Sequence, residues 1–185
     1  MIISRSPLRI SLFGGGTDYP EWFKKNNGIV IGGTINKYSY IHLRYLPKIF
    51  NFNYRLRYFK NELVKNISNI KHGPYREVLK LFNLSNSHIE IIHTSDLPAL
   101  SGLGSSSSST VTAINAVSSL RGKFLSKKNL ANLAIKVERE ILKESVGCQD
   151  QIFSAFGGFN SIRFKSSVDY TVENLILDKK KLNLL

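Results

Sequence analysis

A short run of glycine and serine, Gly102-Leu103-Gly104-Ser105-Ser106, leads directly into an apolar helical pattern, and it constrains the fold more than any other feature. The two glycines allow the backbone to turn tightly, and the small hydroxyl side chains leave the amide groups uncovered. Such amides, together with the positive end of a helix dipole, form a site for anions. The run therefore predicts an anion-binding loop at the start of a helix spanning about Ser106 to Leu120. It lacks the lysine of a Walker loop and the third glycine of the dinucleotide fingerprint.

The bulk composition is that of an ordinary globular protein. With 185 residues, 42% hydrophobic and 21% charged, the chain can bury the core of one domain and is not expected to be disordered. No apolar run approaches the roughly 20 residues that span a bilayer, and Arg5, Pro7 and Arg9 interrupt any signal-peptide core. Cys148 is the single cysteine, so no internal disulfide can form, which favours the cytoplasm and a buried free thiol.

The net charge of +13 is the one unusual bulk property. Between Arg44 and Lys80 there are nine Lys or Arg residues against two acidic ones, Glu62 and Glu77. Such a stretch can contact RNA, an anionic membrane or phosphorylated small molecules, or it can simply be a solvated basic face. The solvated face is the preferred interpretation, followed by phosphate-bearing ligands.

The pattern of residues predicts a strand-rich first half followed by helices. Strands are expected at 2–13, at 89–94 and at 159–164, with two paired strands in 29–46 separated by a turn or bulge at Gly32-Gly33. The stretch 51–73 is expected to hold a strand and an irregular excursion. Besides the helix at 106–120, helices are expected at 74–82, 127–144 and 149–155. This order predicts an α+β fold, with helices packed on one side of a mainly antiparallel sheet, rather than a Rossmann fold.

Three stretches, in this order, resemble the motifs of the GHMP kinase superfamily of small-molecule kinases. Ser6 to Pro20 is similar to its N-terminal substrate motif, Pro98 to Ser106 to its phosphate loop, and Val146 to Gln151, followed by Phe156-Gly157-Gly158, to the segment with the catalytic aspartate. The sequences Gly-Gly-Gly-Thr-Asp and Gly-Cys-Gln-Asp-Gln are most similar to the motifs of the sugar 1-kinases that phosphorylate D-glycero-D-manno-heptose 7-phosphate. The resemblance covers about 150 residues.

The resemblance implies a fold and an activity. The fold is the ribosomal protein S5 domain 2-like N-terminal domain, here over 1–165, with 166–185 starting the connection to a C-terminal ferredoxin-like domain whose glycine motif this sequence lacks. The activity is transfer of the ATP γ-phosphoryl group to a sugar, at the anomeric hydroxyl of the heptose 7-phosphate. A galactokinase-like or other GHMP small-molecule kinase is the alternative. The chain alone could bind nucleotide weakly and turn over little, with a C-terminal half or a second copy as partner.

The resemblance also implies roles for individual residues. Asp150 is the expected catalytic carboxylate, which orients the acceptor hydroxyl and takes its proton. Arg9 is expected to stabilise charge on the transferred group and to lower the pKa of Asp150. The ATP phosphates would lie on Pro98, Ser101, Gly102, Leu103, Gly104, Ser105, Ser106 and Ser107. The sugar would contact Gly15, Gly16, Thr17, Asp18 and Gln149.

Mg²⁺ is the expected cofactor besides ATP, with Ser106 and Glu138 as ligands. Glu138 lies within or beside the apolar arc of its helix, where a carboxylate needs a partner. Glu140 is the fallback ligand, and a boundary salt bridge is the structural alternative. The four histidines, His42, His72, His88 and His93, have no metal-type spacing and are expected to be ordinary strand or surface residues.

Two functions of other classes stay open at this point. One is a basic RNA-binding module, in which Tyr54 and Tyr58 beside Arg55 and Arg57 would stack on bases; the kinase motifs make nucleic acid the less favoured partner. The other is a non-catalytic fragment that keeps the ligand site and has lost turnover.

Overall fold

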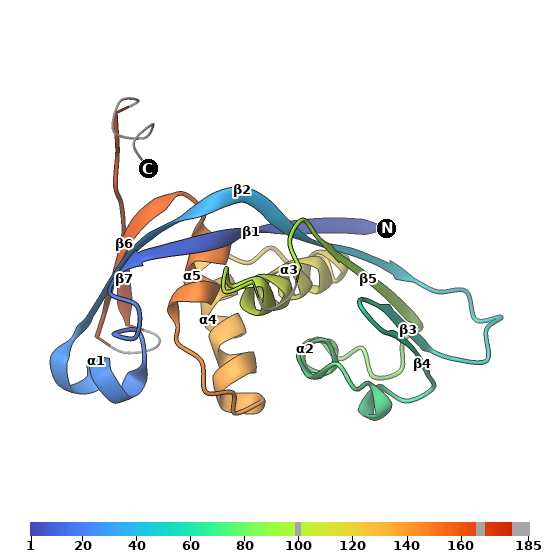
Figure 1. Cartoon of the computed structure of the whole chain (residues 1–185). Coiled ribbons are helices and arrows are strands. Elements are labelled where there is room, and N and C mark those ends of the chain that lie inside the picture. The colour runs from blue at the N-terminus through green and yellow to red at the C-terminus, as the bar shows by residue number, and fades with distance from the viewer. Residues whose placement is uncertain (99–100, 166–168, 179–185) are drawn as a thin grey trace.

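The fold, a computed structural model that describes residues 1–98, 101–165 and 169–178, is a strongly bent sheet with helices beneath one face (Figure 1). The sheet has seven strands in the order β4-β3-β5-β2-β6-β7, and β1 pairs with β2 outside this path. The strands are β1 Ile2–Phe13, β2 Gly28–Tyr45, β3 Tyr54–Arg57, β4 Asn61–Val64, β5 Ile89–Ser95, β6 Phe159–Phe164 and β7 Tyr170–Asn174. All of the pairs are antiparallel except β3 with β5.

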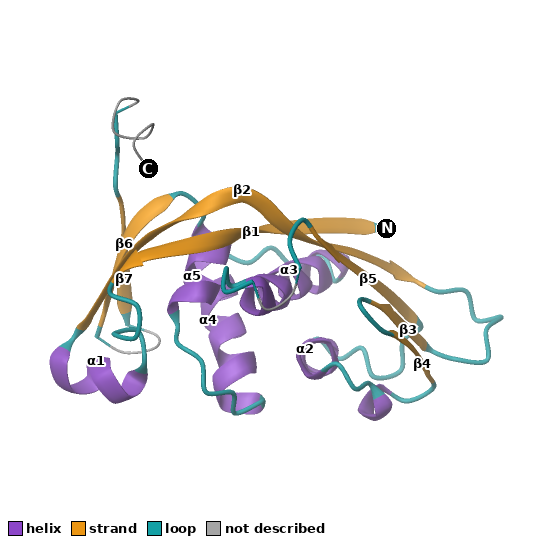
Figure 2. Cartoon of the chain, in the orientation of Figure 1, coloured by secondary structure: helices purple, strands orange, loops and turns teal. Residues whose placement is uncertain are grey.

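The helices all lie on one side of the sheet, which leaves its other face open (Figure 2). They are α1 Pro20–Asn26, α2 Gly73–Leu81, α3 Ser105–Leu120, α4 Lys127–Ile135 and α5 Gln149–Phe156, with a 3₁₀ turn, η1, at Ile67–Asn69 and a π-helical segment, η2, at Lys136–Ile141. The α+β prediction, with helices on one side of a mainly antiparallel sheet, is therefore confirmed.

The prediction of two paired strands between 29 and 46 is wrong. Residues 28–45 form one long strand, β2, whose first half pairs with β6 and whose second half pairs with β5. Gly32 and Gly33 make no turn there; a Cβ on Gly32 would come within 2.5 Å of the Ile10 carbonyl oxygen and 3.0 Å of the Phe153 ring, and one on Gly33 within 2.8 Å of the Phe159 ring. These glycines make room for the backbone of β1 and for aromatic side chains rather than for a reversal of the chain.

The predicted helix at 127–144 also differs from the structure. The α-helix ends at Ile135, one π-helical segment follows, and the helical backbone stops at Ile141. The helix α1, the strand β7, and the second strand and the 3₁₀ turn within 51–73 were not predicted. Because β7 pairs with β6, the sheet continues past residue 165, where the sequence placed the domain boundary.

Two apolar clusters hold the helices against the sheet. The larger joins β2, β3 and β5 to α2, α3 and α4, and the smaller joins Phe23 and Val30 to residues of α4, α5, β6 and β7. Cys148 belongs to the smaller cluster, and burial raises the pKa of its thiol to about 12, so the predicted buried free thiol is confirmed. Within the described residues, no helix is long and apolar enough to cross a membrane.

A β-bulge in the β1–β2 pair positions the segment that carries Arg9. The register shifts between Pro7 and Arg9, so that Pro7 lies opposite Tyr38 and Arg9 opposite Thr34. The backbone N–H of Arg9 donates to the carbonyl oxygen of Leu103 at 3.1 Å. The strand thus holds the glycine-serine loop along its own edge, at the point where β2 changes partners from β5 to β6.

Candidate active site

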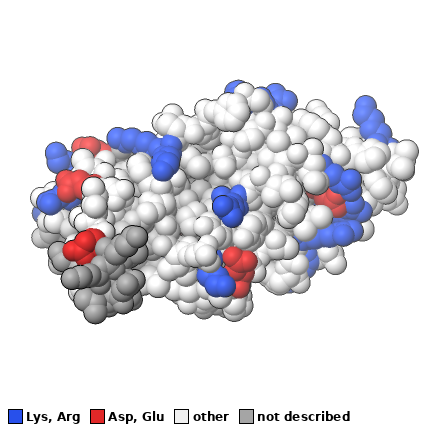
Figure 3. All heavy atoms as spheres, turned by 90° about the horizontal axis from the view of Figure 1, so that it is seen from above, with Lys and Arg blue, Asp and Glu red and all other residues white. Residues whose placement is uncertain are grey.

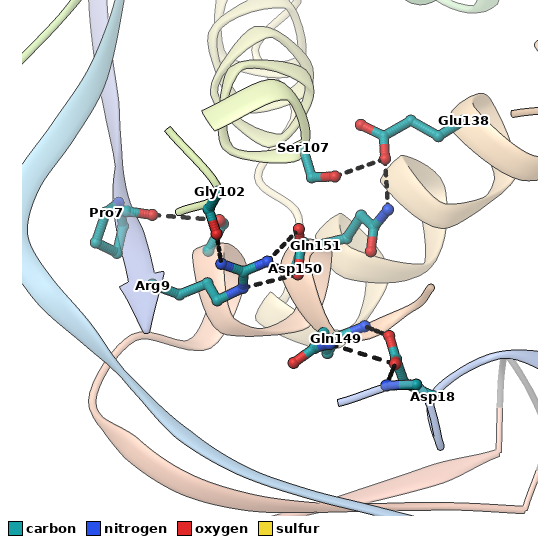
Figure 4. Close-up of polar contacts among 11 residues, drawn as sticks. Pro7, Arg9, Asp18, Gly102, Ser107, Glu138, Gln149, Asp150 and Gln151 are labelled. Carbon is teal, nitrogen blue, oxygen red and sulfur yellow. Dashed lines mark hydrogen bonds and ion pairs between the residues drawn. The ribbon is translucent and has the colours of Figure 1, made fainter. Parts of the chain in front are cut away.

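The structure brings the three sequence motifs together through one side chain, Arg9. Its Nε donates to Asp150 Oδ1 and its Nη2 to Asp150 Oδ2, both at 2.8 Å, although the two residues are 141 positions apart. Its Nη1 donates to the carbonyl oxygen of Gly102, also at 2.8 Å. Figure 4 shows the guanidinium between the loop before α3 and the first turn of α5. Two parallel hydrogen bonds fix a carboxylate more firmly than a single ammonium contact does.

Asp150 is a partly shielded carboxyl in a mixed electrostatic environment. Burial raises its pKa, the bonded Arg9 guanidinium lowers it, and the negative charge of Asp18 raises it again, with a net upward direction. The expected lowering of this pKa by Arg9 is present, but burial outweighs it. A carboxyl that is held by a cation and whose pKa is raised by burial is suited to accept a proton.

The loop before α3 has the backbone conformation that its glycines predicted. Gly102 and Gly104 have φ angles of +73° and +72°, and Gly104 is the residue directly before the helix. Pro98, Gly102 and Ser106 are exposed, whereas Ser107 is buried, and Ser101, Leu103, Gly104 and Ser105 are intermediate. Ala99 and Leu100, which belong to the matched motif, lie outside the described residues.

Gly104→Ala is expected to weaken nucleotide binding at this loop by about tenfold or more, equivalent to about 1.4 kcal/mol. A Cβ at Gly104 would lie 3.3 Å from both Arg9 Cγ and Asp150 Oδ2 and would also have to adopt a left-handed φ. The measurement is calorimetric titration with MgATP. Gly122→Ala is the matched control, because Gly122 has φ +68° with open space around its Cβ position. Equal MgATP affinity in both variants would contradict the role of the loop.

Glu138 is buried at 1% exposure within η2 and faces the start of α3. Its Oε2 accepts hydrogen bonds from Ser107 Oγ at 2.8 Å and from Gln151 Nε2, while its Oε1 lacks a partner of good geometry. Burial raises the pKa of Glu138, and hydrogen bonds from the side chains of Thr110, Ser107 and Gln151 oppose this. The side chain is therefore held inside the protein and is not the boundary salt bridge considered from the sequence. Glu140 is exposed.

The residues fit a divalent cation that is also bound by phosphate oxygens. No group of three or more Asp, Glu, His or Cys side chains that could hold a metal is found among the described residues. Mg²⁺ in nucleotide sites commonly uses one or two carboxylates and completes its shell with phosphates and water. The unpartnered Oε1 of Glu138 is such a carboxylate oxygen. The hydroxyl that contacts Glu138 here is that of Ser107, one residue beyond the predicted Ser106.

The predicted substrate segment forms a turn that ends in a fully buried carboxylate. Gly15 and Gly16 are exposed, and the Thr17 hydroxyl donates to the carbonyl oxygen of Gly14 at 2.8 Å. Asp18 accepts from Gly16 N at 3.2 Å, from Gln149 N at 3.0 Å and from Gln149 Nε2 at 3.3 Å. Asp18 therefore holds the first residue of α5, next to Asp150, as Figure 4 shows. The buried Oε1 of Gln149 has no hydrogen-bond partner.

A cavity of about 450 Å³ opens beside the loop, between α2, the β3–β4 hairpin and the start of α3. Ser105, Ser106 and Ser109 form one wall, and Glu144 joins them from the segment after η2. The other lining residues are Tyr58, Phe59, Lys60, Lys71, His72, Gly73, Pro74, His93, Ser95 and Leu97. Together the lining residues come from five separate segments, so no local pattern in the sequence indicates that they meet. The histidines were predicted as ordinary residues and gave no signal of this cavity.

A fall in pH from 7 to 4 is expected to destabilise the fold partly through His72. This ring stacks on Tyr75 at 3.7 Å, and burial lowers its pKa to about 4. Below pH 6.5 the unfolded chain binds a proton that the folded chain resists, so the free energy of unfolding falls by up to about 3 kcal/mol as the pH drops to about 4. His72→Asn, which keeps an N-cap acceptor for α2, is expected to flatten this slope in urea titrations. An unchanged slope would contradict the assignment.

Part of the charge of the basic stretch at 44–80 is paired with acidic side chains. Arg44 and Arg55 both pair with Glu90, and Arg76 and Lys80 pair with Glu77. Figure 3 shows Lys and Arg in several separate groups on the open face of the sheet, some of them beside acidic residues. Tyr54 is fully buried and donates its hydroxyl proton to backbone carbonyls, so it cannot stack on a base. These observations favour the solvated basic face over an RNA-binding surface.

Comparison with known proteins places the chain in a family. The family model "GHMP kinases N terminal domain" matches residues 60–158. The chain is 34% identical over 173 residues to a D-glycero-alpha-D-manno-heptose 7-phosphate kinase of Campylobacter jejuni, covering 88% of this chain and 50% of that protein. It is 27% identical over 190 residues to a galactokinase of Thermotoga neapolitana, covering 98% and 51% of the two.

The fold is also similar to that of a solved kinase structure. A crystal structure of a D-glycero-D-manno-heptose 1-phosphate kinase from Bacteroides thetaiotaomicron superposes with a TM-score of 0.87 at 26% identity, covering 99% of this chain and 62% of that one. The chain spans about half the length of the curated relatives that it matches. On the family match, the shared fold and the three motifs that meet at Arg9, the chain belongs to the GHMP kinases, of which it carries the N-terminal domain.

Proposed function

We propose that this chain is the nucleotide-binding part of an ATP-dependent sugar kinase and that its acceptor is a heptose 7-phosphate, phosphorylated at the anomeric hydroxyl. The single observation that carries the proposal is the contact of Arg9 with both the Asp150 carboxylate and the Gly102 carbonyl. A cation bound to both the proposed proton acceptor and the proposed phosphate loop is suited to offset the charge that develops in phosphoryl transfer. The heptose acceptor is favoured because the 34% identical relative is a heptose 7-phosphate kinase.

The loop is proposed to bind the ATP phosphates through backbone amides at 102–107, at the positive end of α3. Two features support this. The exposed Gly102 and Ser106 leave the loop accessible, and the cavity of about 450 Å³ beside Ser105 and Ser106 gives the rest of the nucleotide a place to lie. Lys60 and Lys71 line the same cavity and carry positive charge toward it.

Phosphoryl transfer would then need only groups that lie together in the chain. The oxygen of the acceptor hydroxyl attacks the γ-phosphorus, ADP leaves, and the hydroxyl proton passes to the Asp150 carboxylate. Arg9 offsets the charge that grows on the phosphoryl oxygens. Glu138, with Ser106 or Ser107, would hold Mg²⁺, which supplies charge neutralisation for the phosphates when it is bound.

The sugar is proposed to lie at the glycine turn. A cavity of about 490 Å³ is lined by Gly16, Tyr19, Glu21, Trp22 and Ser145, so the predicted substrate residue Gly16 borders an open space with two aromatic side chains. Tyr19 and Trp22 offer apolar ring faces with a polar edge, which suit the mixed surface of a sugar. Asp18 and Gln149 are held against each other behind this turn.

The relatives are about twice as long as this chain, and a further half would close over the cleft and exclude water during turnover. We therefore expect the activity of the chain by itself to be low, and the full activity to require the remaining half of such a kinase. The single cysteine favours a reducing compartment, the cytoplasm, for the reaction.

A coupled ADP-release assay on D-glycero-D-manno-heptose 7-phosphate, galactose and mevalonate tests this function. The expected result is ADP release that depends on the heptose phosphate. Equal rates on heptose 7-phosphate and galactose would overturn the heptose assignment and favour the galactokinase-like alternative. Tight, salt-sensitive RNA binding without any effect of ATP would overturn the kinase proposal as a whole.

A further inference from the structure

Gln151 is a polar side chain that the fold buries completely, one position after Asp150 in the first turn of α5. Its amide nitrogen Nε2 donates to Glu138 Oε2, and its Oε1 is buried without a hydrogen-bond partner. A buried polar atom without a partner costs about 1 to 3 kcal/mol. A leucine or methionine side chain would fill this space without that cost. Packing alone therefore does not explain why an amide side chain lies at position 151.

The contacts of Glu138 show what the amide does. Two of the groups around Glu138, Ser107 Oγ from α3 and Gln151 Nε2 from α5, donate to the same carboxylate oxygen, Oε2, and the Thr110 hydroxyl of α3 also lies close enough to lower its pKa. Two donors on one oxygen fix the rotation of the carboxylate and leave Oε1 without a strong partner. Figure 4 shows Glu138 between the ends of the two helices, with Ser107 and Gln151 directed toward it.

We propose that Gln151 is a positioning residue for the divalent cation of this kinase: it orients the Glu138 carboxylate and keeps Oε1 available as the metal ligand. The inference rests on the proposed function. Groups that hydrogen-bond a metal ligand typically change metal affinity by about 10- to 100-fold when they are removed. Because Gln151 follows Asp150 directly, the same turn of α5 would align the proton acceptor and the metal carboxylate.

The test measures metal binding apart from turnover. Mn²⁺ is titrated into the chain with saturating ADP and followed by the electron paramagnetic resonance signal of free Mn²⁺. The variant Gln151→Met keeps the length of the side chain and removes the donor, and we expect Mn²⁺ affinity to fall by about 10- to 100-fold. ADP affinity in EDTA is expected to stay within about twofold of the parent's, because the hydrogen bond that Gln151 donates runs to Glu138 rather than to the loop backbone.

Two further variants make the result specific. Ser154→Ala removes another buried hydrogen bond of α5, which runs to the carbonyl oxygen of Pro7 at 3.2 Å, and is expected to leave Mn²⁺ affinity unchanged. Gln151→Asn keeps an amide that is too short to reach Glu138; it replaces Gln151→Met if that variant does not fold, with the same expected loss.

The outcomes separate the inference from the function on which it rests. Mn²⁺ affinity within twofold of the parent's in the Gln151 variant would overturn the inference, as would equal losses of ADP affinity with and without metal. If the parent chain binds neither ADP nor Mn²⁺–ADP, the proposed function itself fails, and the role of Gln151 fails with it.

Discussion

Asp150→Asn is expected to lower the rate of phosphoryl transfer by about 10²- to 10⁴-fold, the usual contribution of a general base. Asparagine keeps the shape of the side chain and can still accept a hydrogen bond from Arg9, but it cannot take the hydroxyl proton. MgATP affinity is expected to change little, because the Asp150 carboxylate contacts the Arg9 side chain rather than the loop amides. The measurement is ADP release at saturating heptose 7-phosphate, with calorimetry for MgATP.

Glu173→Gln is the matched control for this change. Glu173 lies on β7, and its side chain is 56% exposed in a loose pair with Arg163 at 3.6 Å. Loss of one such surface charge is expected to leave the rate unchanged. Undiminished ADP release by Asp150→Asn would contradict the assignment of the proton acceptor.

Arg9→Met is expected to have the second large effect, on both the rate and its dependence on pH. The cation lowers the pKa of Asp150 against the opposing effect of burial. Without it the carboxyl pKa rises further, so the acid limb of the kcat/KM profile moves to higher pH, since the unprotonated form is the active one. The maximal rate is also expected to fall by at least about 10²-fold, because a charge-stabilising donor is lost.

Stability gives an independent readout of the same variant. The side chains of Arg9 and Asp150 are 12% and 25% exposed, so Arg9→Met leaves a shielded carboxylate without its cation. The expected loss in the free energy of unfolding is about 2 to 4 kcal/mol, somewhat below the range for fully buried pairs. Arg163→Met, in a pair more than half exposed on both sides, is expected to lose less than about 1 kcal/mol. For the pH profile of kcat/KM, an acid limb that stays in place or moves to lower pH in Arg9→Met would contradict the effect of Arg9 on the pKa of Asp150.

The sequence was most informative where one local pattern decides the structure. The alternation at 2–13 and the helical pattern after Ser105 predicted β1 and α3 closely. That Arg9, Gly102 and Asp150 belong to one site followed from the family resemblance, because nothing local in the chain relates residues 93 and 141 positions apart.

Other features depended on packing between distant segments. Gly32 and Gly33 suggested a turn, yet they accommodate the rings of Phe153 and Phe159, which only the folded sheet brings near. The π-helical segment that contains Glu138 interrupts the helix expected at 127–144, and within it Glu138 accepts a hydrogen bond from Ser107 of α3. The cavity beside the loop draws on Tyr58, His72 and Glu144, which no spacing rule connects.

The central claim is that the loop at 102–107, held by Arg9, binds the phosphates of MgATP. Calorimetric titration of the chain with MgATP tests it most directly. We predict saturable binding to one site, weakened about tenfold or more in Gly104→Ala and unchanged in Gly122→Ala. The claim would be contradicted if MgATP gave no binding heat and labelled ATP did not bind in a second assay. It would also be contradicted if Gly104→Ala bound MgATP as tightly as the parent does.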